Sequence, residues 1–229
     1  MRALRISAYD TLGYLATGYA LLFLLDWALG HCVFGCRIML NSDPSLGGSV
    51  FVGVLSYVTG HLLGHASQYL IEELIVKRWY APRDLDLFSD DPRLNWSKIV
   101  YLSTETRRRI RKRMGEEKIR ETGSDLFYRF DIIVKRNEIV ADRLNAFLVL
   151  YGFCRNMALA LFVSSAAFLV RDVLEMWETG AQPGIHWFSW PVCLVSGYCM
   201  YHRYIKFYGT YTSTVFRNFA EGDKPQESK

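Results

Sequence analysis

The sequence predicts an all-α, polytopic membrane protein with about four transmembrane helices and a cytoplasmic helical layer. Four apolar stretches, at 12–25, 50–71, 146–170 and 187–201, stand apart from the densely charged segment 77–142. The overall composition, 51% hydrophobic with a mean hydropathy of +0.06, would also suit a large soluble domain, so the clustering decides the class. A helix that crosses a bilayer needs about 20 apolar residues, and the second and third stretches reach that length.

The first and fourth stretches are less clear spans. The first reaches spanning length only if 7–29 is counted, and no small-x-small cleavage pattern follows it, so we expect it to remain as a helix. In the fourth, Pro191 lies within the stretch, and Trp187 and Trp190 are typical of a membrane interface. Three spans therefore remain an alternative to four.

The distribution of lysine and arginine predicts the orientation. The segment 77–142 carries 16 of the 27 basic residues, whereas the connection 31–49 has only Arg37 and the connection 171–186 has only Arg171. Because basic loops stay on the cytoplasmic side, we expect both termini and the middle segment on the cytoplasmic side of the cell inner membrane. Termini on one side require an even number of spans, which favours four.

We expect four consecutive parts in the chain. They are a first transmembrane helix pair at 1–76, a basic cytoplasmic helical segment at 77–142, a second transmembrane helix pair at 143–205, and a cytoplasmic C-terminal helix and tail at 206–229.

Helical signals recur through the cytoplasmic parts. The loop 84–96 is acidic and turn-rich, and Ser103 offers an N-cap for a helix that continues through residue 120. Gly123 breaks that helix, and a second helix from Leu126 is expected to run without interruption into the third span. We expect this second helix to pack on the C-terminal helix through positions that recur at helical spacing. The two faces are Phe127, Phe130, Ile133 and Val134, and Tyr204, Phe207, Tyr208, Tyr211, Val215, Phe216 and Phe219.

A polar stripe lies on the second apolar stretch. Its members follow helical spacing along one face and are Tyr57, His61, His65, Gln68 and Glu72. Such a stripe suits a helix that faces a wet cavity or pore, and equally a seam between helices, where Gly60 and Gly64 would allow close approach. A metal site built from His61, His65 and Glu72 is a weaker alternative, because the HxxxH spacing comes without a general base in the zinc-protease position.

Arg155 lies in the middle of the third apolar stretch. Charged groups are costly in a bilayer and usually face a bundle interior, a cavity or a partner. Glu72 and Glu73 lie near the cytoplasmic end of the second span, whereas Asp26 lies near the outer end of the first. We therefore expect an intramembrane pair of Arg155 with Glu72 or Glu73. The alternative is a third helix that starts lower, so that Arg155 extends to the interface.

Six basic residues in seven positions form a cationic run in the middle segment: Arg107, Arg108, Arg109, Arg111, Lys112 and Arg113. Such a run is often only a solvated face. Beside a membrane it attracts anionic lipids, by about 1 kcal/mol per basic residue. A cytoplasmic protein or ribonucleoprotein is an alternative partner. Only Ile110 interrupts the run and no aromatic side chain offers a stacking platform, so anionic lipid ranks above nucleic acid.

The five cysteines predict no disulfide framework. Cys154, Cys193 and Cys199 fall in apolar stretches and are expected to be small buried hydrophobes, whereas Cys32 and Cys36 would share the first outward loop and could pair there. The sequence contains no nucleotide-binding loop, no Ser/His/Asp arrangement and no redox CxxC motif. It therefore predicts no catalytic residue, metal or cofactor, although His61, His65 and Glu73 leave a lipid-acting enzyme open.

Three segments resemble a group of small, poorly characterised prokaryotic membrane proteins. They are Tyr9-Asp10-Thr11-Leu12-Gly13-Tyr14-Leu15 with Gly18, Gly60-His61 through Glu72, and Arg203-Tyr204 through Phe216-Arg217. Some similar multi-span proteins are membrane accessory proteins of RNA-guided, RNA-targeting CRISPR systems in phage defence. Thr17 stands where that group often has a proline, and the matched motifs cover a minor part of the chain. The resemblance implies a membrane-disturbing or pore-forming role in antiviral defence, carried out by an oligomer.

Together, these features predict a homo-oligomeric inner-membrane protein that alters membrane permeability when a cytoplasmic signal or partner engages its helical layer. Two alternatives stay open. One is a membrane-embedded enzyme that acts on lipid, and the other is a non-catalytic membrane anchor that recruits a cytoplasmic partner through 77–142.

Overall fold

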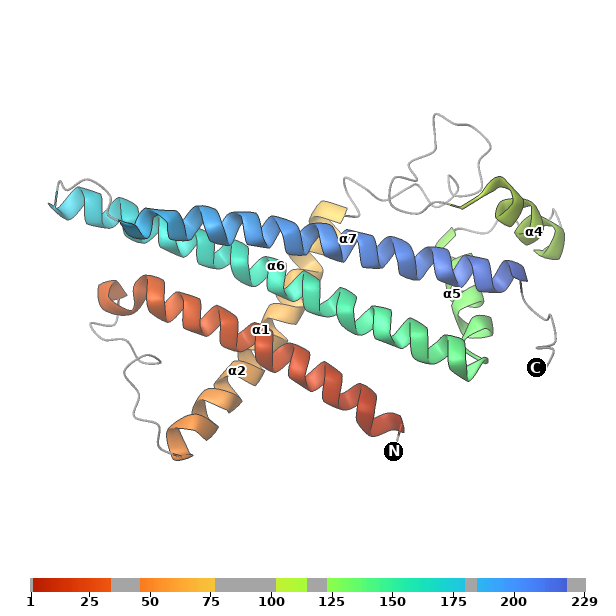
Figure 1. Ribbon diagram of the computed structural model, residues 1–229, viewed down its shortest axis with the longest axis horizontal. Helices are drawn as coiled ribbons and strands as arrows, with labels where there is room; N and C mark the ends of the chain where they lie inside the picture. The colour runs from red at the N-terminus through yellow and green to blue at the C-terminus, as the bar shows by residue number, and fades with distance from the viewer. Residues whose placement is uncertain (1, 34–45, 77–101, 115–122, 180–184, 222–229) are drawn as a thin grey trace. The chain divides into compact units, whose positions relative to one another are not determined.

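The computed structural model describes residues 2–33, 46–76, 102–114, 123–179 and 185–221 (Figure 1). These residues are almost entirely helical and contain no strand, so the all-α prediction is confirmed for them. The elements in chain order are α1 (Arg2–Val33), α2 (Leu46–Ser67), the π-helix η1 (Gln68–Val76), α4 (Thr104–Met114), α5 (Gly123–Val134), α6 (Glu138–Thr179), the 3-10 turn η4 (Ile185–Phe188) and α7 (Ser189–Glu221).

The chain divides into two compact units. Unit 1 comprises Met1–Leu74 and Tyr151–Tyr204, and unit 2 comprises Ile75–Leu150 and Ile205–Lys229. Both α6 and α7 contribute residues to each unit. Each unit is described separately below.

Two described helices are long and apolar enough to cross a membrane. They are Gly47–Glu73, which runs from α2 into η1, and Glu138–Glu178, which is nearly all of α6. Among the other described helices, α1 contains a shorter apolar segment, Gly13–Leu29, and α7 does not meet the same criterion. Length and composition thus suggest membrane association through two helices, while four spans and their orientation stay predictions.

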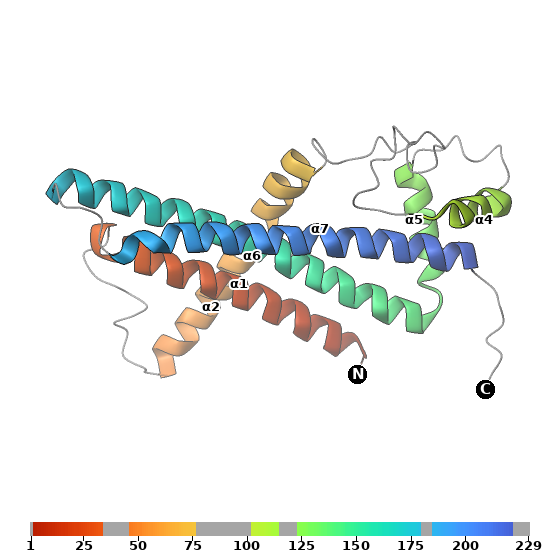
Figure 2. The ribbon, with the colours of Figure 1, turned by 45° about the horizontal axis from the view of Figure 1, so that its top comes forward.

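In unit 1, α1 and α2 cross at two glycines (Figures 1 and 2). A Cβ placed on Gly18 would lie 1.8 Å from the backbone oxygen of Ser56, and one on Gly60 would lie 2.0 Å from the backbone oxygen of Tyr14. Thr17, buried beside the crossing, donates its hydroxyl to the backbone of its own helix at 2.9 Å. The two backbones are therefore in contact, which only residues without a side chain permit.

The later part of α1 packs on α6 and α7. The buried residues of this cluster are Ala28, Ala167, Phe168 and Cys193, with Leu24, Leu25, Trp27, Leu29 and Trp190 around them. Trp27 meets Phe168 edge-on, with ring centroids 5.7 Å apart. Ser165 of α6 donates its hydroxyl to the Trp190 carbonyl of α7 at 2.8 Å. The two helices therefore run side by side in this unit (Figures 1 and 2).

Both long C-terminal helices extend further than their apolar stretches. Pro191 lies in the first turn of α7, where a missing N–H removes no intrahelical hydrogen bond, so the proline does not interrupt the stretch. The predicted continuation of this helix beyond Tyr201 is confirmed. The expected connection 171–186 is wrong in its first part, because α6 continues to Thr179 and Arg171 pairs with Asp172 at 2.7 Å along that helix.

Aromatic packing holds unit 2 together. The buried cluster consists of Leu102, Ile110, Phe130, Val134, Leu144, Tyr211, Val215, Phe216 and Ala220. Phe130 of α5 stacks on Phe219 of α7 with ring centroids 3.7 Å apart, and Tyr211 donates its hydroxyl to Asp131 at 2.8 Å. The predicted packing of α7 on this helix is confirmed for Tyr211, Phe216 and Phe219. Ile133 is instead 47% exposed, and the rings of Tyr204 and Phe207 lie beside Tyr151 and Phe147 of α6.

The helix expected to run without interruption from Leu126 into the apolar stretch is broken. α5 already begins at Gly123 and ends at Val134, and α6 starts anew at Glu138 after three intervening residues. Asn137 caps α6, because its side-chain oxygen accepts hydrogen bonds from the N–H groups of Ile139 at 3.1 Å and Val140 at 3.4 Å. The prediction of one continuous helix was therefore wrong, since asparagine readily caps a new helix start.

The start of α4 is as predicted. The side-chain oxygen of Ser103 accepts the N–H of Thr106 at 3.2 Å, which is the expected N-cap. The extension of this helix to residue 120, the acidic loop 84–96 and Cys36, with its pairing to Cys32, lie outside the described residues.

Candidate functional site

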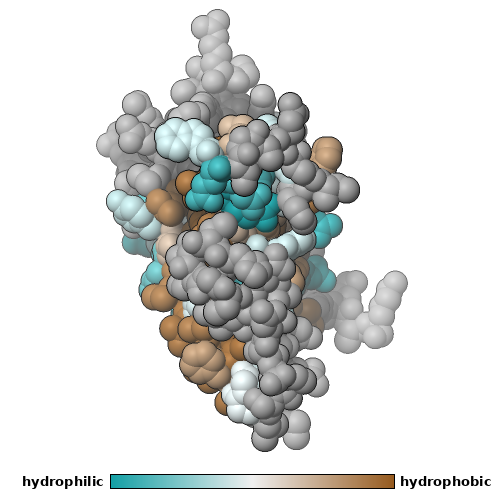
Figure 3. Space-filling view, turned by 90° about the vertical axis from the view of Figure 1, so that its left-hand side faces the viewer, coloured by the Kyte–Doolittle hydropathy of each residue, from teal (hydrophilic) through white to brown (hydrophobic). Residues whose placement is uncertain are grey.

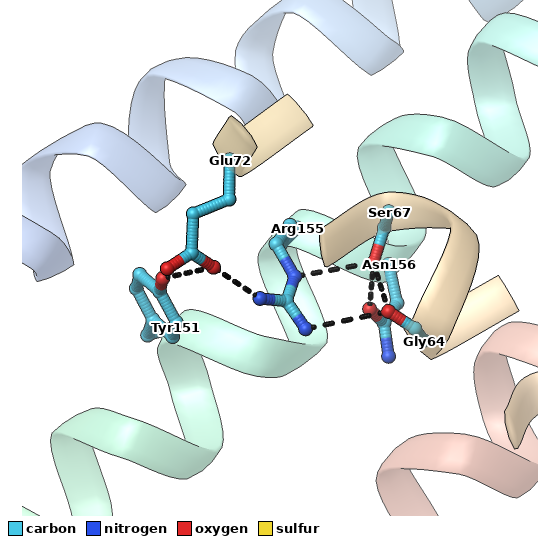
Figure 4. Close-up of polar contacts among 6 residues, drawn as sticks. All are labelled: Gly64, Ser67, Glu72, Tyr151, Arg155 and Asn156. Atoms are coloured by element: carbon cyan, nitrogen blue, oxygen red, sulfur yellow. Dashed lines mark hydrogen bonds and ion pairs between the residues drawn. The ribbon is translucent and has the colours of Figure 1, made fainter. Parts of the chain in front are cut away.

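Arg155 of α6 forms the centre of a polar cluster with α2 and η1 (Figure 4). Its Nη1 donates to Glu72 Oε2 at 2.6 Å, its Nε to Ser67 Oγ at 3.1 Å and its Nη2 to the Gly64 carbonyl at 3.5 Å. The side chain is 12% exposed. All three guanidinium nitrogens are thus engaged inside unit 1, so Arg155 points into the bundle and not toward an interface.

Two further side chains of α6 complete the cluster. The Tyr151 hydroxyl donates to the same Glu72 oxygen at 2.8 Å, and its ring lies 5.6 Å from the Arg155 guanidinium carbon. Asn156 is almost fully buried, and its side-chain oxygen accepts a hydrogen bond from the Ser67 hydroxyl at 2.6 Å. The carboxylate of Glu72 therefore accepts two hydrogen bonds, and its charge faces a cation.

The helical register changes within the cluster. Gly64 and Ser67 close α2, whereas Glu72 lies in η1, which is π-helical. In a π-helix the hydrogen bonds join residues five apart, so Ser67 and Glu72 come to lie on one face. A continuous α-helix would have placed Glu72 with the polar stripe, and the π-helical turn brings it to Arg155 instead. Such turns are frequent at functional sites.

The structure divides the predicted polar stripe. His61 lies between two tyrosine rings, stacked on Tyr14 of α1 at 4.1 Å and edge-on to Tyr57 at 4.6 Å. Tyr57 remains partly open, and His65 and Gln68 are exposed. The α1–α2 seam therefore includes His61, and Glu72 belongs to the Arg155 cluster. Tyr57 and His65 of α2 and Gln68 of η1 are the exposed members of the stripe.

The side of α2 that faces away from α1 and α6 is apolar and open. The exposed large apolar side chains of α2 are Val50, Phe51, Val54, Leu55, Val58 and Leu62, with Leu62 66% exposed, and Tyr69 and Leu70 of η1 are exposed as well. Figure 3 shows apolar side chains gathered on the lower part of the face it presents, where α1 and α2 lie in Figure 1. This surface is suited to lipid.

The other residues proposed from the sequence do not assemble with this cluster. Glu73 is exposed on η1, and the structure pairs Arg155 with Glu72. His61, His65 and Glu72 are not brought together, and the described residues hold no group of three His, Cys, Asp or Glu side chains suited to a metal ion. The metal alternative therefore has no support in the described part of the chain.

The cationic run of α4 has two faces in unit 2. Arg107 and Ile110 are buried, and Arg113 donates to the Phe219 carbonyl in the last turn of α7. That contact supplies a donor to a carbonyl near a helix end, where intrahelical partners run out. The exposed cations of the opposite face are Arg108, Arg109 and Lys112, and Arg111 is half-buried. Part of the run therefore anchors α4, and only part is available to a partner.

Sequence reasoning missed Tyr151, Ser67 and the backbone of Gly64 as partners of Arg155. Tyr151 precedes Arg155 by four residues, which places both on one face of α6, and this spacing is visible in the sequence. Ser67 follows Gly64 by three residues on α2, and a buried serine near a helix end is a weaker signal.

No family model matches the chain, and comparisons with characterised proteins and with solved structures likewise give no match.

Proposed function

We propose that this protein is a multi-pass inner-membrane protein that assembles as a homo-oligomer and alters membrane permeability. The observation that carries the proposal is an open polar flank formed by Tyr57 and His65 of α2 and Gln68 at the start of η1, called the open polar flank of α2 below. Polar and titratable side chains are costly against lipid and usually face a bundle interior or a water-filled cavity. A second copy of the chain, with water between the copies, would satisfy this flank.

The three sides of α2 support the same conclusion. One side packs on α1 and α6 through Gly60 and Gly64, and another is the open apolar surface around Leu62. The third side is the open polar flank. A helix with one side packed within its own chain, one apolar side and one polar side suits a pore-forming assembly, because such a helix must contact its own bundle, lipid, and water or a second copy.

The test changes the flank and leaves the α1–α2 seam intact. The double variant His65→Leu/Gln68→Leu removes two exposed polar groups from the flank. The matched control is Ala66→Leu, which enlarges an exposed residue of the same helix turn but removes no polar group. Dye leakage from liposomes and the oligomer size in detergent are measured for both variants and for the wild-type chain.

The expected result is that the double variant keeps its oligomer size and loses leakage, while Ala66→Leu behaves as wild type. His61→Leu should instead weaken the protein fold, because His61 is stacked on Tyr14 of the seam. A wild-type chain that remains a monomer and does not leak would contradict the proposal. Lipid turnover without leakage would favour the enzyme alternative.

The second candidate is a membrane anchor that recruits a cytoplasmic partner. It is favoured by α4, whose buried side is fixed by Ile110 and Arg113 while Arg108, Arg109 and Lys112 point outward. An anchor would show no leakage, and Arg108→Gln/Lys112→Gln would abolish recruitment of an acidic protein or ribonucleoprotein. Cytoplasmic placement of both termini and of unit 2 is part of either proposal.

A role in prokaryotic antiviral defence is the part of the proposal that follows from the sequence resemblance. It is checked by comparing phage plaque formation on cells that express the wild-type chain with formation on cells that express His65→Leu/Gln68→Leu. Equal plaque numbers, with and without the wild-type chain, would remove the defence role and leave the permeability proposal standing.

A further inference from the structure

Unit 2 carries an exposed apolar patch that its own core does not explain. α5 buries Phe130 against α7, yet Tyr128 on its outer face is 67% exposed and Ile132 is 63% exposed. Residues four apart lie on one face of an α-helix, so these two side chains are neighbours. Ile133 beside them and Ile139 at the start of α6 are also exposed. α5 thus has apolar side chains on two sides. The side with Phe130 packs in the core of unit 2, and the side with Tyr128 and Ile132 is exposed.

Basic side chains border this patch. Arg129 is exposed and directly follows Tyr128, and Arg136 is exposed in the turn that follows α5. The nearby carboxylate of Asp131 already pairs with Lys135 at 2.5 Å and accepts the Tyr211 hydroxyl. An exposed helix face that combines apolar residues and tyrosine with arginine is typical of helices that lie in a membrane interface.

A membrane surface is also close to α5 in the chain. Three residues separate the end of α5 at Val134 from the start of α6 at Glu138, and the apolar stretch 146–170 of α6 begins about two helical turns further on. A helix of 12 residues would be marginal by itself in water, but the contacts of Phe130 with α7 keep α5 formed. Docking therefore needs little additional ordering, which favours binding.

A second copy of the chain suits the patch less well than a bilayer. Copies related by a two-fold axis would place the same patch against itself. Arg129 and Arg136 would then face the same arginines of the other copy, and like charges repel. Lipid phosphates offer these guanidinium groups opposite charge and matching geometry.

We propose that α5 docks on the surface of an anionic bilayer. Tyr128, Ile132 and Ile133 enter the boundary between headgroups and acyl chains, and Arg129 and Arg136 contact the lipid phosphates. This inference rests on the membrane insertion proposed above and does not depend on oligomer formation or leakage.

The experiment measures how deeply single labelled residues of the full chain lie in the bilayer. A fluorescent label is attached to Ile132→Cys in a chain whose native cysteines are replaced by alanine, reconstituted in liposomes of equal parts phosphatidylcholine and phosphatidylglycerol. Leu62→Cys on α2 is the reference for a lipid-exposed site, and Lys112→Cys on α4 is the reference for a water-exposed site. Quenchers carried on lipid chains and quenchers dissolved in water are compared.

The label at residue 132 should be quenched from the lipid, as at residue 62, and protected from the aqueous quencher, unlike residue 112. Each of the substitutions Arg129→Gln and Arg136→Gln should weaken docking about fivefold on the anionic surface. In liposomes of phosphatidylcholine alone, which carry no net negative charge, the wild-type arginines should also dock more weakly, so lipid quenching at residue 132 should fall. Unchanged helix content in the arginine variants shows that unit 2 is still folded.

Three other results would each overturn the inference. If residue 62 is quenched from lipid and residue 132 only from water, α5 does not dock although the chain is inserted. If residue 62 is also quenched only from water, membrane insertion itself fails. If protection of residue 132 disappears on dilution of the protein in lipid, with crosslinks between copies at higher density, a second copy covers the patch.

Discussion

Removal of a charged side chain from water costs several kcal/mol, and the surroundings of Arg155 show how this chain offsets that cost. The guanidinium donates to a carboxylate, a hydroxyl and a backbone carbonyl, and Tyr151 supports both the cation and Glu72. Breaking such a cluster from one side leaves the other charge unpaired in an apolar environment. The cluster is therefore expected to act as a lock between α6 and the α2–η1 helix.

Substitution of Arg155 tests this lock. Arg155→Ala should destabilise the protein by about 3–5 kcal/mol and sharply lower its accumulation in membranes, because Glu72 loses its cation. Arg155→Lys should be intermediate, since an ammonium group keeps the charge but loses the fork of donors. The measurements are membrane accumulation and thermal unfolding in detergent, with the exposed Arg203→Ala as control. Wild-type behaviour of Arg155→Ala would show that the cluster does not stabilise the protein.

Tyr211 gives unit 2 a dependence on alkaline pH. Burial and the hydrogen bond to the Asp131 carboxylate raise the pKa of Tyr211 above its ordinary value of 10.0. The folded state therefore holds the phenol proton more tightly than the unfolded state. The resulting stabilisation is complete below pH 10.0 and is lost as the pH rises further toward the folded-state pKa.

This dependence predicts a shift in alkaline unfolding. Tyr211→Phe should remove one component of the stability loss above pH 10.0, while Tyr128→Phe, at an exposed position, should leave the profile unchanged. Helix content followed by circular dichroism against pH provides the measurement. Identical profiles for Tyr211→Phe and the wild-type chain would mean that the Tyr211 proton is not linked to folding.

At the scale of helices, the glycines of α1 and α2 determine how closely the two helices approach. Gly18 of α1 and Gly60 of α2 each face a backbone oxygen of the opposite helix. Gly53, which also lies on α2, has no atom within 4 Å of an added Cβ. Small residues at such crossings allow van der Waals contact between backbones in a membrane. The crossing is thus fixed by two positions and not by the glycine content of the helices.

Gly60 and Gly53, both on α2, offer a matched pair of variants. Gly60→Ala should destabilise unit 1 by about 1–3 kcal/mol, because its Cβ forces the helices apart. Gly53→Ala adds the same methyl group in open space and should be neutral or stabilising by up to about 1 kcal/mol. Thermal unfolding in the same detergent compares the two, and an equal effect of both variants would contradict the crossing as described.

At the scale of the whole molecule, the predicted orientation is the property that the permeability, anchor and docking proposals share. Positive-inside placement puts both termini and α4 in the cytoplasm and the connection before α2 outside. Two described helices are sufficient in length and composition to cross, and both termini on one side require an even number. Two or four spans place both termini on one side, but α4 lies between the two described candidates, so only four spans also keep α4 on the side of the termini.

Labelling of single cysteines in intact cells tests the orientation. With native cysteines replaced, Ser49→Cys at the start of α2 should react with a membrane-impermeant maleimide from outside, and Lys112→Cys on α4 should react only after the cells are opened. Both positions are exposed, so a difference reports the side of the membrane. Reaction of Lys112→Cys in intact cells would overturn the cytoplasmic placement of unit 2.

The sequence by itself predicted the helical class, the two helices apolar enough to cross a membrane and an acidic partner for Arg155. These properties follow from composition and spacing along one chain, because spanning length and the cost of an unpaired charge do not depend on details of packing. The aromatic face of α7 was likewise visible as a helical repeat, and the structure shows Phe216 and Tyr211 buried there.

Tertiary structure decided what periodicity alone could not. A period of 3.6 residues assumes an unbroken α-helix, whereas Glu72, which pairs with Arg155, lies in the nine-residue π-helical segment η1. A run of like charges does not show which of its residues contact the rest of the protein. In the structure Arg113 donates a hydrogen bond to the Phe219 carbonyl in the last turn of α7, and its neighbour Lys112 is exposed. The chain breaks at Asn137 because the Asn137 side chain caps a new helix by accepting the Ile139 N–H. Hydrophobic spacing contains no information about such a side-chain to backbone hydrogen bond.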